Sequence, residues 1–140
     1  DTIRKVTKIV LCHDQEVGAS PAGVRRSVNR IGEDIFRMLF DVKRADILAQ
    51  SDYLREEKLA RLAYIYDLYD EICRKQECVS LKDLAVTGSD LIALGVPPGR
   101  EIGVILHELL EIVLEEPERN TREELIRMYA QRRKCAELLP

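Results

Sequence analysis

The chain has 140 residues, of which 46% are hydrophobic and 34% are charged, a composition typical of helix-rich globular domains. Aromatic residues make up only 5% and Trp is absent, which argues against a base-stacking platform of exposed rings. The net charge of −3 excludes a generally basic nucleic-acid binder. No apolar run approaches the roughly 20 residues that span a bilayer, so we expect no membrane partner.

Charge is distributed unevenly along the chain. Residues 1–61 carry 12 Lys and Arg against 10 Asp and Glu, whereas residues 62–140 carry 10 against 15. Binding to RNA would therefore use local basic strips and backbone contacts, and not a global electrostatic field.

The cysteine spacing and the first residues of the chain indicate the state of the thiols and the extent of the polypeptide. The four cysteines match no Cys-x-x-Cys zinc pair: Cys12, Cys73, Cys78 and Cys135. We expect free thiols in the cytoplasm, with no disulfide partner. The chain begins at Asp1 inside a periodic segment, without an initiator Met or a signal peptide, so we expect it to be a piece of a longer polypeptide.

Helical periodicity dominates the first half of the chain. Apolar residues recur at helical spacing in four segments, over residues 3–12, 21–30, 33–50 and 53–76. A loop at 13–22 contains Gly18 and Ser20-Pro21, and Gly32 separates the second segment from the third. Ser51-Asp52 is expected to cap the last of the four.

The segment 81–110 carries two turn signals and two helix starts. Thr87-Gly88 precedes a short apolar run that Gly95 closes, as a glycine just past a helix end does. Pro97-Pro98-Gly99 then begins a strongly periodic helix with Gly103 in its first turns. Backbone N–H groups are unpaired at a helix N-terminus and the helix dipole is positive there, so this segment is suited to gripping phosphate.

Residues after Pro117 predict one more helix. Thr121 with Glu124 forms a capping-box pattern for a helix over residues 122–134. Strand signals are nearly absent, so the fold class is all-α. A boundary near Glu77 to Ser80 predicts two helical units, a body over residues 1–78 and a tail over residues 79–140.

Two groups of residues are candidates for contact with an RNA backbone. Gly103 inside a helix costs roughly 1 kcal/mol relative to Ala, a cost that the close approach of another helix or of a ligand backbone would explain. Arg26 and Arg30 lie four residues apart on one helix face, in a strip that also includes Arg25, although a solvated face balanced by acidic residues is the interpretation that we favour. The RNA-binding candidates are Thr87, Gly88, Gly99, Arg100, Gly103, Arg26 and Arg30.

Catalytic and metal-binding signals are weak. The chain has no nucleophile elbow, no Walker-type loop and no metal-ligand spacing, so we expect no catalytic residue and no cofactor within it. His13-Asp14 matches the dyad of HD-type metal-dependent phosphohydrolases, and Asp46 stands where their downstream Asp could be. The simpler interpretation of the dyad is a loop or capping role.

The segment 82–110 resembles the tail region of bacterial CCA-adding enzymes, the tRNA nucleotidyltransferases related to bacterial poly(A) polymerases. Many members carry D-L-x-V-T-G-x-D-L followed by G-x-x-P-G-x-x-I-G-x-x-L, and here residues 83–91 and 95–106 match these two patterns. Residues 8–50 more loosely resemble the later helices of the HD-type region that precedes this tail in one branch of the family.

The resemblance implies a parent enzyme that adds C, C and A to tRNA 3′ ends. A head outside this chain would carry the Mg²⁺-binding carboxylates and would use CTP and ATP, whereas this chain would be the body and tail that hold the tRNA. Two alternatives remain open. One is a fragment of an HD-type phosphohydrolase that uses His13, Asp14 and Asp46, and the other is a helix-hairpin-helix-like module for DNA.

Overall fold

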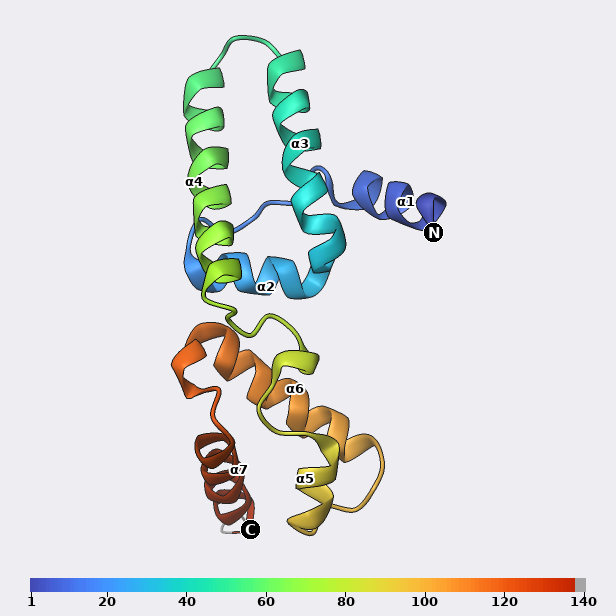
Figure 1. The fold of residues 1–140 in the computed structure, drawn as a ribbon, viewed down its shortest axis with the longest axis vertical. Helices are drawn as coiled ribbons and strands as arrows, with labels where there is room; N and C mark the ends of the chain where they lie inside the picture. Colours follow the sequence, from blue (N-terminus) through green and yellow to red (C-terminus); the bar gives the residue numbers. More distant parts are fainter. Residues whose placement is uncertain (138–140) are drawn as a thin grey trace. The chain divides into compact units, whose positions relative to one another are not determined.

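The computed structural model describes the backbone of residues 1–137 and the side chains of residues 1–134. All regular structure in this part of the chain is helical, with seven α-helices and two short 3-10 helices, so the predicted all-α class is confirmed (Figure 1). The chain divides into two compact units, Asp1–Glu77 and Cys78–Pro140.

Four helices form the first unit: α1 (Thr2–Cys12), α2 (Pro21–Ile31), α3 (Glu33–Ala49) and α4 (Arg55–Arg74). Helices α3 and α4 form a hairpin, α2 packs across both of them, and α1 packs against α3 (Figure 1). The core consists of aliphatic and aromatic side chains from α2, α3 and α4 that recur at helical spacing: Val24, Val28, Ile31, Ile35, Phe36, Leu39, Phe40, Ile65, Tyr69 and Ile72.

Local signals set most of the helix ends in this unit. Ser20 caps α2 by accepting a hydrogen bond from the Gly23 backbone N–H at 3.1 Å. Gly32 ends α2 with a φ of +96°, a conformation that favours glycine. The predicted cap at Ser51-Asp52 is wrong, because Leu54 has a left-handed φ of +55° and α4 begins only at Arg55.

The second unit contains the 3-10 helix η1 (Leu81–Asp83), α5 (Gly88–Ala93), α6 (Arg100–Glu115), η2 (Pro117–Arg119) and α7 (Arg122–Glu137). Helix α6 is central, since α5, α7 and both 3-10 helices pack against it. Its buried side chains are Ile105, Leu109, Leu110, Val113 and Leu114. They pack with Leu91 of α5 and Leu125 of α7.

Only half of the predicted capping box at α7 forms. The Thr121 hydroxyl accepts from the Glu124 backbone N–H at 3.3 Å, as expected. The Glu124 carboxylate pairs with Arg127, and the Thr121 N–H donates to the Arg119 carbonyl at 2.7 Å. Because both reciprocal partners are engaged elsewhere, the second hydrogen bond of the box is replaced.

Two further features concern the predicted absence of a membrane partner and the predicted free thiols. None of the helices in the described residues is long and apolar enough to cross a membrane. Cys12, Cys73 and Cys78 are free thiols, while the side chain of Cys135 lies outside the described residues.

Candidate nucleic-acid interface

At the first predicted helix start, Thr87-Gly88, side chains of the same segment cap the helix. Thr87 and Asp90 form a complete capping box, in which the Asp90 carboxylate accepts from the Thr87 N–H at 2.8 Å. Arg122 of α7 donates to the same carboxylate at 2.9 Å. These contacts, the Thr87 backbone bond first, lower the pKa of Asp90 to about 2. The Thr87 N–H and the Asp90 carboxylate are therefore both engaged within the fold.

Gly88 has a packing role at this helix start. A Cβ atom at Gly88 would lie 3.1 Å from Cγ2 of Ile102, closer than ordinary van der Waals contact. The glycine therefore lets α5 approach α6. Thr87 and Gly88 both have roles inside the fold, and their contact with RNA stays a prediction.

The second predicted helix start, at α6, is open. Gly99 precedes the helix with a φ of +148°, which L side chains rarely adopt, and no side chain among the described residues caps the helix. The first N–H groups of an α-helix have no partner within the helix. Arg100, the first residue of α6, is exposed and has no ion-pair partner in the part of the chain that the structure describes.

Gly103 lies on the exposed surface of α6, four residues after Gly99. A Cβ atom at either glycine would meet no described atom within 4 Å. A close helix crossing within the described residues, one of the two explanations offered by the sequence, does not account for Gly103. Gly99, Arg100 and Gly103 together form a surface of bare backbone beside one cation, called here the α6 glycine surface.

The two predicted arginines of α2 belong to the other unit. Arg26 and Arg30 are both exposed on α2. Arg25, expected in the same strip, is buried, and its guanidinium donates to the Glu77 carboxylate at 2.6 Å. The strip is therefore smaller than predicted, because helical spacing turns Arg25 into the core.

The residues of the HD-like dyad gather around a lysine. His13, Asp14 and Asp46 line one cavity of about 380 Å³ between the 13–17 loop, α3 and α4. Lys43 lies among them and donates to the carbonyls of His13 and Gln15, at 2.7 Å in both cases. Burial lowers the pKa of Lys43, and Asp14 and Asp46 oppose that shift.

The metal-binding prediction for this cavity gains no support from the geometry. No group of three or more His, Cys, Asp or Glu side chains in the described part of the chain is arranged to hold a metal ion. The His13 ring nitrogen Nδ1 is 2.6 Å from the Val10 carbonyl, a contact typical of a residue that follows a helix end. The Lys43 ammonium already places a cation beside Asp14 and Asp46, and it ties the loop to α3.

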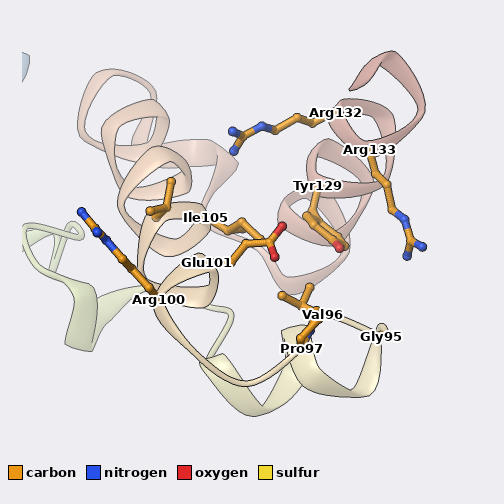
Figure 2. Close-up of a pocket in the computed structure, with 10 residues that line it drawn as sticks. Gly95, Val96, Pro97, Arg100, Glu101, Ile105, Tyr129, Arg132 and Arg133 are labelled. Atoms are coloured by element: carbon orange, nitrogen blue, oxygen red, sulfur yellow. The ribbon is translucent and has the colours of Figure 1, made fainter. Parts of the chain in front are cut away.

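Sequence reasoning missed a second group of residues in the C-terminal unit. A cavity of about 590 Å³ lies between the α5–α6 loop, the first turns of α6 and the face of α7 that carries Tyr129 (Figure 2). Its unpredicted polar lining residues are Glu101, Tyr129, Arg132 and Arg133. The Arg132-Arg133 pair was visible in the sequence, but the face of α6 that α7 covers was not.

A model of one protein family matches most of the chain. The family is described as tRNA nucleotidyltransferase domain 2, putative, and the match spans residues 25–129, three quarters of the sequence. The matched span contains the α6 glycine surface and both α2 arginines, and it begins after His13 and Asp14. Comparisons with curated proteins and with solved structures gave no significant match.

Proposed function

Because this chain belongs to the family of tRNA nucleotidyltransferase domain 2, we propose that it holds tRNA for a nucleotidyltransferase that adds CCA to tRNA 3′ ends. Nucleotide transfer would use a head outside this chain, with Mg²⁺, CTP and ATP bound there. The part played by the present residues is to grip the RNA backbone and fix its position relative to that head.

The α6 glycine surface is the observation that carries this proposal. Gly103 costs roughly 1 kcal/mol of helix stability relative to Ala, and nothing packed inside the described fold needs its small size. The absence of a Cβ atom at Gly103 would allow a phosphate or ribose to approach the helix backbone closely from outside. The N–H groups of the first turn and the positive end of the helix dipole then face the incoming anion.

Charge supports a local contact of this kind. The chain as a whole is negative, at −3, so RNA cannot be attracted by the general field. Arg100 supplies one positive charge beside the open helix start, and a guanidinium suits bidentate bonding to phosphate. The carboxylate of Glu101, in the same turn, is directed to the other side, toward Tyr129 (Figure 2). Recognition would depend on the shape and backbone of tRNA, with base selection left to the head.

The proposal is tested by titrating the full chain with tRNA at several salt concentrations, with duplex DNA of similar size as comparator. We expect saturable binding that prefers tRNA, weakens with salt, and loses about one unit of salt slope in Arg100→Gln. Arg127→Gln is the matched control, because Arg127 is exposed on α7 and pairs with Glu124. Equal slopes in the two variants would remove Arg100 from the interface, and a preference for DNA would favour the helix-hairpin-helix alternative.

A phosphohydrolase function finds less support. Lys43 holds a positive charge where a metal would meet Asp14 and Asp46, and two of its N–H bonds are committed to backbone carbonyls. Like charges repel at this spacing, so a divalent cation would have to displace the ammonium.

A further inference from the structure

The cavity beside α7 shares Arg100 with the α6 glycine surface, but the rest of its lining has a different chemistry. Its floor is apolar, with Val96 and Ile105 both buried, and Pro97 closes one side. Tyr129 of α7 presents its ring to the same space (Figure 2). Its volume of about 590 Å³ falls within the roughly 300–1,000 Å³ typical of sites for small organic groups.

Two kinds of charge meet in this cavity. The Glu101 carboxylate is directed toward Tyr129, whereas the guanidinium of the neighbouring Arg100 points away from both (Figure 2). Glu101 has no hydrogen-bond or ion-pair partner among the residues that the structure describes. Arg132 and Arg133 of α7 stand at the rim, where Arg132 is oriented by its ion pair with Glu108.

These groups together narrow the choice of occupant. A purely anionic ligand would meet the Glu101 carboxylate, and a purely apolar one would leave that carboxylate desolvated without a partner. The occupant needs a flat apolar face for Tyr129, a hydrogen-bond donor for Glu101, and negative charge outside the cavity for Arg132 and Arg133.

We propose that this cavity binds an unpaired nucleotide of the RNA whose base carries an amino group. Such a base stacks on Tyr129, its amino group donates to the acceptor-only carboxylate of Glu101, and its flanking phosphates reach Arg132 and Arg133. Adenine, cytosine and guanine each carry such an amino group, and guanine adds an N1–H donor beside it. Uracil does not, because its single N–H donor is flanked by two carbonyl oxygens that the carboxylate repels.

This inference rests on the proposed function, since it assigns a base-reading site to a chain proposed to grip the RNA backbone. It adds base selectivity to a contact otherwise governed by shape and charge. The cavity lies within the C-terminal unit and uses only residues of α6, α7 and the loop before α6.

The test measures binding of the full chain to single-stranded oligomers of adenosine, cytidine or uridine, equal in length and at one salt concentration. We expect the adenosine and cytidine oligomers to bind about five- to tenfold more tightly than uridine. In Glu101→Gln this difference should fall below about twofold without weaker binding of uridine, because an amide both donates and accepts.

Glu123→Gln is the matched control, because the substitution removes the same charge. Glu123 lies in the first turn of α7 and does not line the cavity. It should preserve the base preference. An unselective wild-type chain, or a preference that survives Glu101→Gln, would overturn the inference. Binding of free CMP as tight as that of the cytidine oligomer would also overturn it, by making the occupant a free nucleotide.

The outcomes separate this inference from the function on which it rests. If tRNA binding depends on Arg100 but no base preference exists, only the cavity assignment fails. If neither tRNA nor any oligomer binds, both fail. Circular dichroism of each variant confirms that the helices are retained.

Discussion

Gly103→Ala should change stability and RNA binding in opposite directions. Beyond the adjacent backbone of α6 itself, no described atom lies within 4 Å of the added methyl group, so no clash opposes the substitution. Replacing glycine by alanine inside a helix contributes about 0.5–1 kcal/mol. For a unit the size of Cys78–Pro140 that gain corresponds to a rise in Tm of roughly 2–8 °C.

The same methyl group would hold an RNA backbone away from the first turn of α6. Loss of one backbone hydrogen bond to phosphate costs about 1 kcal/mol, or about fivefold in Kd. Differential scanning calorimetry and tRNA titration measure the two effects on the same sample. Higher Tm with unchanged tRNA affinity would refute the reasoning, because RNA would then not approach Gly103.

Gly88→Ala is the matched control for Gly103→Ala. Its Cβ atom would lie 3.1 Å from Cγ2 of Ile102, so the Ile102 side chain must move by a few tenths of an ångström to accommodate it. We expect no gain in Tm from this variant. A gain equal to that of Gly103→Ala would show that the contact with Ile102 relaxes without cost.

Other predictions concern charged groups. Glu77→Gln should cost about 3 kcal/mol in urea unfolding, because it removes the negative charge of a buried ion pair with Arg25, whereas Glu71→Gln, which breaks an exposed pair with Lys75, should cost less than about 1 kcal/mol. Equal costs would mean that burial of the first pair is unimportant. The depressed pKa of Asp90, about 2, means that its contribution to stability is present above pH 4 and is lost as the pH falls from about 4 toward 2. Asp90→Asn should therefore flatten the decline of Tm over that range, and an unchanged decline would exclude Asp90 as its source.

Helical periodicity and glycine and proline signals were enough to predict the α-helices of the described residues, but neither 3-10 helix was predicted. The ends of α2 and α3 and the start of α6 fall within one or two residues of the predicted positions, and Gly32 and Pro98-Gly99 are the local signals that interrupt the helices there. The start of α4 was misplaced, since the left-handed conformation of Leu54 has no signature in a leucine.

The candidate interface was predictable only in part. Glycine spacing singled out Gly99 and Gly103, but the open space around them depends on which elements pack nearby. Arg25 was assigned to a surface strip because its partner, Glu77, is 52 residues away in the sequence. The cavity at Tyr129 was missed for a similar reason, since it forms only where α7 meets α6.

The most direct test of the proposed tRNA contact is an amide NMR titration of the chain with an RNA minihelix containing the top half of tRNA. The amide signals of Gly99, Arg100 and Gly103 should shift or broaden on binding, while that of Val113, buried farther along the same helix, should change least. Binding that leaves the three α6 signals unchanged would contradict the proposal and assign the glycines to the free fold alone.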